Sequence, residues 1–345
     1  MNSENKSLKS RFAAPKGCSP LSTGVALSLT AVSSILAGAF PSDYGGIIFL
    51  IMAVGLFSYV LTARFNLFFV LAGAITSVAV SMACGVKLPY ALVALSFIPL
   101  SFILSDSVRK RKCFSSAVSA LTAAFIVVAA LILGLFYIAE GNELVTALTN
   151  MANDFFANLD AYIARINEAA EAAGKEVYTE NYIQSLKNAI YLLMPSMIVL
   201  AFMAASFAAA KVFRLATIVA DSNEMFFGGA WPVSASFLGS MVFLISFVVS
   251  ILTTKSEIVY YSAVNIMYIF MPSQTIVGFK LMFARGGLLR RSGKKGLGLI
   301  TIGILIYFAF INPILILELA AMFTAFYNIR VWMYLRRKSK ENKQD

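Results

Sequence analysis

The 345-residue sequence contains no histidine and only three cysteines. Cys18, Cys84 and Cys113 are far apart and show no C-x-x-C spacing, so the sequence indicates neither a disulfide framework nor a zinc site. Without histidine, the chain lacks the commonest general base, metal ligand and proton switch near neutral pH. We therefore expect no metal and no cofactor.

Sequence signatures of enzymes are also missing. There is no glycine-rich phosphate loop, no H-E-x-x-H or G-x-S-x-G motif, and no close aspartate pair within an apolar run. The pairs Gly228-Gly229 and Gly286-Gly287 lack the strand–loop–helix setting of a phosphate loop, and we interpret them as turns. We expect a protein that is not an enzyme and has no ATPase of its own, so any ATP-driven work would need a partner subunit.

Charged residues are scarce as well, at 13% of the chain, whereas hydrophobic residues make up 59% and the mean hydropathy is +0.81. Such a composition is far from that of a soluble domain. It arises from repeated apolar runs of about 20 residues, each long enough to cross roughly 30 Å of hydrocarbon. The sequence predicts an all-α fold, a polytopic bundle of transmembrane helices with the lipid bilayer as its partner.

The sequence predicts about ten spans. The first run ends in Ala37-Gly38-Ala39, which resembles a signal-peptide cleavage site, but it is longer than the apolar core of about 7–15 residues that signal peptides have. We interpret it as a retained helix. At the other end, Pro313 separates two runs that could instead form one long tilted helix. The predicted spans are Leu21–Phe40, Gly45–Leu61, Phe65–Met82, Leu88–Leu104, Ala117–Ile138, Ile190–Ala210, Val233–Leu252, Val259–Lys280, Leu297–Ile311 and Ile314–Met333.

The net charge of +11 comes from bases in short segments between and beyond the spans. In a soluble protein such a charge would suggest nucleic acid. Here the bases fall on alternate loops, among them residues 109–112 and 285–295, as the positive-inside rule requires. We expect no nucleic-acid partner, and we place the basic tails 1–20 and 336–345 on the cytoplasmic side of the cell membrane.

Residues 140–188 form a polar, acidic insert between two membrane halves, 21–139 and 189–335. The charge rule places this insert outside the cell. Its apolar residues recur at three- and four-residue steps and so share one helical face. We expect this helix to end near Ala172-Ala173-Gly174 and to form either a solvated cap or an outer lid. The residues of the face are Leu144, Leu148, Met151, Phe155, Leu159, Tyr162 and Ile166.

Polar groups within the later spans are candidate site residues, because such groups are costly in lipid. Asn265 and Gln274 lie in one predicted span with Pro272 between them, and Glu318 is the acidic residue of the last span. They could line a solute pocket, or the amides could join helices through hydrogen bonds, worth about 0.6 kcal/mol each on average. Glu318 could also be an interfacial carboxylate. Pro195, Pro272 and Pro313 are expected to kink or break helices.

The second half carries short cues of a known family: Leu193-Met194-Pro195, Trp231-Pro232, Asn265, Gln274, Gly278-Phe279 and Asn328-Ile329-Arg330. On these residues the chain resembles the YybS-like family of uncharacterised bacterial membrane proteins. It departs from that pattern at Asn328, where the family commonly has an acidic residue, and at Thr275, where it has glycine. The family is remotely similar to the S components of energy-coupling-factor transporters. The resemblance implies a membrane subunit that binds a small solute.

The sequence therefore leaves two functions open. The first is an integral membrane protein that binds or transports a small solute, with Asn265, Gln274 and Glu318 at its site and a separate ATPase subunit as a possible partner. The second is a scaffold or regulator of the cell envelope that transports nothing. A polar cavity at the two amides would favour the first function, and a dry bundle with both amides bonded to neighbouring helices would favour the second.

Overall fold

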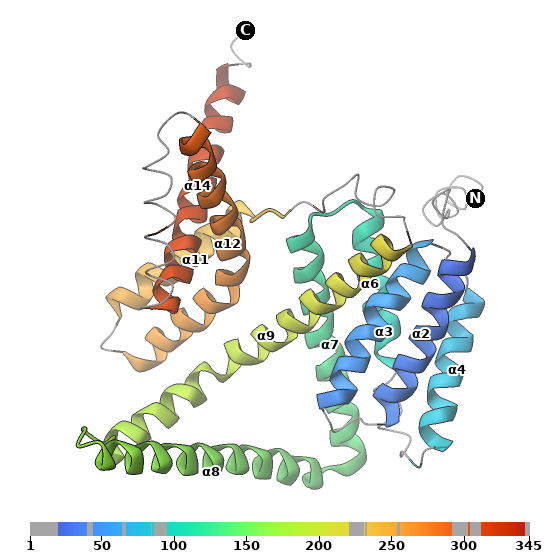
Figure 1. Cartoon of the computed structure of the whole chain (residues 1–345), viewed down its shortest axis with the longest axis horizontal. Helices are drawn as coiled ribbons and strands as arrows, with labels where there is room; N and C mark the ends of the chain where they lie inside the picture. The colour runs from blue at the N-terminus through green and yellow to red at the C-terminus, as the bar shows by residue number, and fades with distance from the viewer. Residues whose placement is uncertain are drawn as a thin grey trace. The chain divides into compact units, whose positions relative to one another are not determined.

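The computed structural model describes residues 20–39, 44–63, 67–83, 85, 95–220, 231, 233–253, 256–291, 303 and 312–341. Throughout these ranges α-helix is the regular secondary structure, and no strand occurs in them (Figure 1). The helices are α2 (Pro20–Ala39), α3 (Tyr44–Ala63), α4 (Leu67–Ala83), α6 (Phe97–Arg109), α7 (Phe114–Glu140), α8 (Asn142–Ala172), α9 (Glu180–Val219), α11 (Phe237–Leu252), α12 (Glu257–Arg291) and α14 (Pro313–Glu341).

Four of these helices contain apolar stretches that are long enough to cross a membrane, and α2 and α11 contain shorter ones. This confirms the predicted all-helical fold with membrane-spanning helices. The count of ten spans stays a prediction, because the ninth predicted span and residues 88–94 of the fourth lie almost wholly outside the described ranges. The four stretches are Gly45–Ala63, Phe114–Ile138, Glu180–Val219 and Ile314–Arg336.

Three helices run further than the apolar pattern predicts. α9 continues to Val219, α12 to Arg291 and α14 to Glu341. The interpretation of Gly286-Gly287 as a turn is wrong, since both glycines lie within α12. Lysine, arginine and leucine are good helix formers, so hydropathy marks where a helix leaves the lipid and not where the helix ends. Gly228-Gly229 lies outside the described ranges.

The chain forms two compact units. The first contains residues 1–188 and 201–231, and the second contains residues 189–200 and 232–345. The division therefore falls within α9, whose middle turns belong to the second unit.

In the first unit, α3 packs between α2 and α6 (Figure 1). Its last three turns are almost wholly buried, with Phe57 and Tyr59 as the largest enclosed side chains. Gly55 permits a very close approach to α9, because a methyl group there would lie 2.7 Å from the Ala209 carbonyl and 2.6 Å from Val212. This is the small-residue packing expected of Ala209 in a lipid-embedded helix.

The predicted insert contains α8, which begins directly after Gly141 (Figure 1). Gly141 has a φ of 54°, a value at which glycine has no steric penalty, and it lets the chain leave α7 abruptly. α8 ends at Ala172, and Gly174 follows at a φ of 65°, so the predicted helix and its end are confirmed. Much of its apolar face is open: Met151 is 69% exposed.

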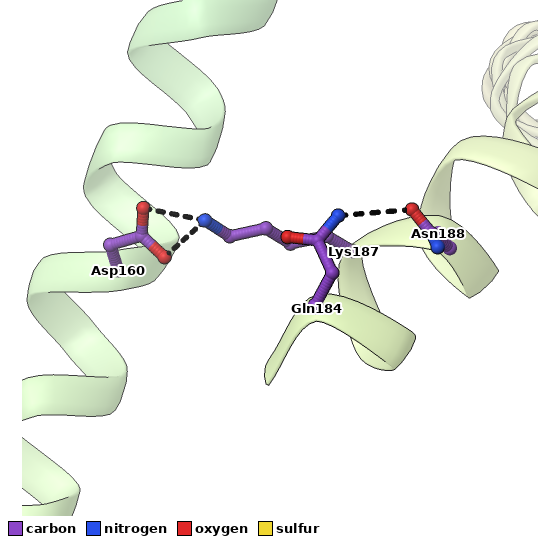
Figure 2. A network of polar contacts seen from close by, with 4 residues as sticks. All are labelled: Asp160, Gln184, Lys187 and Asn188. Atoms are coloured by element: carbon purple, nitrogen blue, oxygen red, sulfur yellow. Dashed lines mark hydrogen bonds and ion pairs between the residues drawn. The ribbon is translucent and has the colours of Figure 1, made fainter. Parts of the chain in front are cut away.

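A hairpin joins α8 to the start of α9. The Asn167 amide donates to the Tyr178 carbonyl at 3.1 Å and accepts from the Tyr178 N–H at 2.9 Å. Figure 2 shows the second contact, in which the Lys187 ammonium of α9 lies 2.7 Å from the Asp160 carboxylate of α8. Because both side chains are partly exposed, this ion pair contributes about 1 kcal/mol at most. The two exposed hydrogen bonds of Asn167 to the backbone hold the hairpin together with this ion pair.

The second unit is built from α11, α12, α14 and residues 189–200 of α9 (Figure 1). Its buried cluster consists of Phe243, Val264, Met267, Ala321 and Ala325. α12 and α14 cross very closely at Gly278. A methyl group at this position would lie 2.8 Å from the Thr324 hydroxyl and closer still to the Ala320 backbone.

We expect Gly278→Ala to destabilise the protein by about 1–3 kcal/mol, because α14 must move to admit the methyl group. Gly134→Ala is the matched control, since nothing lies within 4 Å of the space that its methyl group would fill. The control should match or slightly exceed the parent, because alanine favours helix over glycine by about 1 kcal/mol. The measurement is the unfolding temperature in detergent, and equal temperatures for the two variants would contradict the close crossing.

Candidate functional site

The two predicted site amides lie on opposite faces of α12. Asn265 and Gln274 are nine residues apart, which is about two and a half helical turns. Asn265 bonds to α9, whereas Gln274 bonds to α11. The structure therefore does not bring the two amides together at one site.

Asn265 completes the hydrogen bonding of α9 beside Pro195. Its amide nitrogen donates to the Leu192 carbonyl at 2.7 Å, and its amide oxygen accepts from the Ser196 N–H at 3.1 Å. These two backbone groups are the pair that bond each other in a regular α-helix. Pro195 has no N–H, and its ring crowds the Tyr191 carbonyl, so the helix is loosened at this turn. The Asn265 amide spans the loosened turn as a peptide group would.

Gln274 belongs to a polar cluster between α11, α12 and α14, in which Ser240, Gln274 and Thr324 are buried, Asn328 is half-buried and Ser236 is exposed. We call these five residues the amide cluster. The Gln274 amide oxygen lies 3.0 Å from the Ser240 hydroxyl. The Asn328 amide of α14 donates to the same hydroxyl at 2.9 Å and to the Ala235 carbonyl at 3.1 Å. Gln274 is only 1% exposed and Ser240 is fully buried. Three helices thus direct polar side chains to one point.

The amide cluster leaves one hydrogen-bonding group without a partner in the part of the chain that the structure describes. The Gln274 amide nitrogen is buried there and makes no hydrogen bond. It faces Gly239, where an added methyl group would lie 3.4 Å from it. The single Ser240 proton cannot serve both the Ser236 carbonyl, at 3.0 Å, and Gln274. The Gln274 amide can be placed with either its oxygen or its nitrogen toward Ser240. In both orientations the other polar atom faces Gly239, which has no side chain to bond it.

The backbone around Gln274 is fixed by α14. The Thr324 hydroxyl donates to the Gln274 carbonyl at 2.7 Å, and the Thr275 hydroxyl donates to the Leu317 carbonyl at 3.0 Å. Both hydroxyls are buried. Leu317 and Thr324 lie on either side of Ala320, the residue of α14 that contacts Gly278. The two contacts therefore fix the backbone of α12 from which the Gln274 side chain extends.

The remaining predicted residues lie outside the amide cluster. Glu318 is half-buried on α14, and within the described ranges it makes no hydrogen bond or ion pair. Pro272 lies inside α12, and Pro313 is the first residue of α14. The Asn312 side chain accepts from the Leu315 N–H at 3.0 Å, so this helix begins with an asparagine cap followed by proline.

A second array of buried hydroxyls joins α3 to α6 in the first unit. The Ser58 and Ser101 hydroxyls both donate to the Val54 carbonyl, at 2.6 and 3.0 Å. One turn further, the hydroxyls of Thr62 and Ser105 lie 2.9 Å apart. Every member has a partner, so the array explains helix association and offers nothing to a ligand.

At the end of this array, Arg109 of α6 donates to the Leu61 carbonyl of α3. Burial lowers the pKa of the Arg109 guanidinium, and the Asp106 carboxylate opposes that shift. The guanidinium satisfies a carbonyl in the last turn of α3, where cations are favoured.

Sequence reasoning missed Ser240, Thr324, Ser58 and Ser101, and considered Asn328 in the comparison with the family pattern but not at the candidate site. Serines and threonines four residues apart on an apolar run, such as Ser58 with Thr62, were the available signal. A hydroxyl can bond its own helix four residues back. Spacing alone therefore does not show which hydroxyls reach a neighbouring helix.

No group of three or more histidine, cysteine, aspartate or glutamate side chains comes together within the described ranges. The chain matches no family model, no curated protein and no solved structure. The functional assignment therefore depends on the residues of this chain.

We expect Asn265→Ala to cost about 1–3 kcal/mol of stability, because it leaves two part-buried backbone groups of α9 without their side-chain partner. In a Pro195→Ala background the cost should be smaller, since the Ser196 N–H and the Leu192 carbonyl can then bond each other in a regular turn. A double-mutant cycle on unfolding in detergent should give a coupling energy of about 0.5–3 kcal/mol. Additive effects would contradict the bridging role of Asn265.

Proposed function

We propose that the protein is an integral membrane protein whose second unit binds a small solute at the amide cluster. The observation that carries this proposal is the Gln274 amide, which is 1% exposed and has one polar end without a partner among the described residues. An unpaired buried donor costs about 1–3 kcal/mol, so a group that satisfies it gains that much. Polar groups in lipid-embedded helices mark solute paths for the same reason.

The amide cluster favours an uncharged or zwitterionic solute with hydrogen-bonding groups. It consists of amides and hydroxyls and contains no side chain with a formal charge. A carbonyl or hydroxyl of the solute would accept from Gln274 when the amide nitrogen faces Gly239. Transport, rather than binding alone, would need the α11–α12 contact at Gly239 to open.

A second candidate function is a membrane scaffold or regulator, and the interhelical bonds of both amides favour it. Both ends of the Asn265 amide join α12 to α9, and the Gln274 amide oxygen joins α12 to Ser240 of α11. This is the arrangement expected of a bundle held by interhelical hydrogen bonds. Membership of the YybS-like family and coupling to a separate ATPase subunit stay predictions, as does the absence of enzymatic activity.

We also propose the topology that the charge pattern predicts: about ten spans in the cell membrane, with α8 outside and both termini in the cytoplasm. The described helices support it in that α7 is apolar from Phe114 to Ile138 while α8 is polar and largely exposed. Bases directly precede α7, and acidic residues follow it. The segments that flank α7 therefore change from positive charge before the helix to negative charge after it.

The binding proposal is tested with Gln274→Met, which preserves volume but removes the amide. A panel of metabolites is screened for solutes that raise the unfolding temperature of the parent in detergent. A solute that does so should bind Gln274→Met about tenfold more weakly, the loss expected from one buried hydrogen bond.

Gln184→Ala is the matched control, because Gln184 is an exposed glutamine near the start of α9 that bonds Asn188 at 3.3 Å (Figure 2). It should retain the full response. A solute response that survives unchanged in Gln274→Met would remove the amide cluster from the site. A panel in which no solute raises the unfolding temperature of the parent would leave the scaffold function favoured.

The topology is tested with single cysteines in a background whose three native cysteines are replaced by serine. Glu168→Cys on the exposed part of α8 should react with a membrane-impermeant thiol reagent on intact cells. Lys338→Cys should react only after the cells are permeabilised, because a charged reagent does not cross the bilayer. The opposite pattern would invert the topology.

A further inference from the structure

The turn between α6 and α7 is anchored by a cluster of aromatic residues. The Trp231 indole N–H donates to the Lys112 carbonyl at 3.0 Å, and the Trp231 ring packs edge-on against Phe114 at 5.0 Å. Phe114 packs in the same way against Phe207 of α9 at 5.4 Å. Trp231 is 5% exposed and Phe114 is 7% exposed. The last part of α9 is therefore fixed against the turn.

Five basic residues lie in this turn and in the last part of α9: Lys110, Arg111, Lys112, Lys211 and Arg214. The Lys211 ammonium lies 5.0 Å from the centre of the Phe207 ring and 5.5 Å from that of Phe114. Arg214 follows Lys211 by three residues and so lies on the same side of α9. In the described ranges, only Lys110 of the five makes an ion pair, with Asp106 at 2.6 Å.

Arg214 carries a hydrogen-bonding group that has no partner in the part of the chain that the structure describes. This group is its Nε atom, which is buried. The positive-inside rule accounts for bases in a loop, but it does not account for a guanidinium nitrogen that is taken out of water without an acceptor. Phosphate oxygens satisfy a guanidinium through two parallel hydrogen bonds.

The position of this turn favours a lipid headgroup as the phosphate that would bind Arg214. The apolar stretch of α7 begins at Phe114, directly after the bases, so the turn lies at the end of a predicted span. The lipid phosphates lie at that depth, and basic pockets between helices on the cytoplasmic side bind anionic headgroups. We propose that Lys112, Lys211 and Arg214 form a binding site for the headgroup of an anionic phospholipid.

The test uses Trp231 as the reporter. The chain has two tryptophans, and Trp332→Phe leaves only Trp231. The purified full-length variant is placed in phosphatidylcholine bilayers in which brominated phosphatidylglycerol, a tryptophan quencher, replaces part of the lipid. Brominated phosphatidylcholine is titrated in parallel. The preference for phosphatidylglycerol should be roughly fivefold or more, since one well-placed base at a membrane surface supplies about that factor.

Adding Lys211→Gln and Arg214→Gln to the Trp332→Phe variant should bring the preference ratio, phosphatidylglycerol over phosphatidylcholine, close to one. The matched control is Arg165→Gln with Lys187→Gln, which removes two positive charges from the α8–α9 hairpin of the same unit and should leave the preference unchanged. Equal quenching by the two lipids in the parent, or a preference that survives in the Lys211/Arg214 variant, would overturn the site.

Two further arms use the Trp332→Phe parent alone, so they hold even if the double variant does not fold. Raising sodium chloride should weaken the preference, because exposed charges are screened, and a preference that is insensitive to salt would overturn the proposal. Inorganic phosphate at matched ionic strength should have no additional effect. If it abolishes the preference, the site takes free phosphate and the lipid assignment is wrong.

Discussion

The structure depends on one constraint: in hydrocarbon, a backbone or side-chain polar group must find its hydrogen-bond partner within the protein. Asn265 shows how strictly the second unit meets this constraint, since both ends of its amide bond to α9 at the turn that Pro195 loosens. The α3–α6 hydroxyls meet it in the first unit, through the Val54 carbonyl. Against this background the Gln274 amide stands out, because one of its polar ends is left over among the described residues.

Close packing is the second way in which these helices associate. Lipid tails are as apolar as leucine, so burial of apolar surface contributes little and van der Waals contact contributes most. Gly55 and Gly278 bring their helices close enough for backbone to touch backbone. Thr324 lies beside Gly278 and bonds the Gln274 carbonyl, so the closest crossing of the second unit also positions its candidate site. Small residues and polar residues thus act together in this unit.

The sequence was sufficient to predict the all-helical fold, several apolar helices and the polar helix α8, because hydropathy and periodicity are local properties. It placed the end of α8 correctly from Ala172-Ala173-Gly174. It ended α9 and α12 too early, because a helix can continue in water where its apolar stretch stops. Sequence reasoning placed Asn265 and Gln274 at one site, although their nine-residue spacing already puts them on opposite faces of a helix. The partners of Gln274 do not follow from spacing, since Ser240 and Asn328 lie on other helices and only the packing brings them together.

The bridge at Pro195 has a consequence for the order in which the protein is made. Asn265 is synthesised 69 residues after Ser196, whose N–H it accepts. At about 5–20 residues per second, the ribosome takes several seconds to cover that distance. During this interval Asn265 is not yet present to bond the Ser196 N–H and the Leu192 carbonyl. Until α12 is made, these two groups must bond water or other polar groups instead, so the turn at Pro195 reaches its final hydrogen bonding later than the rest of α9.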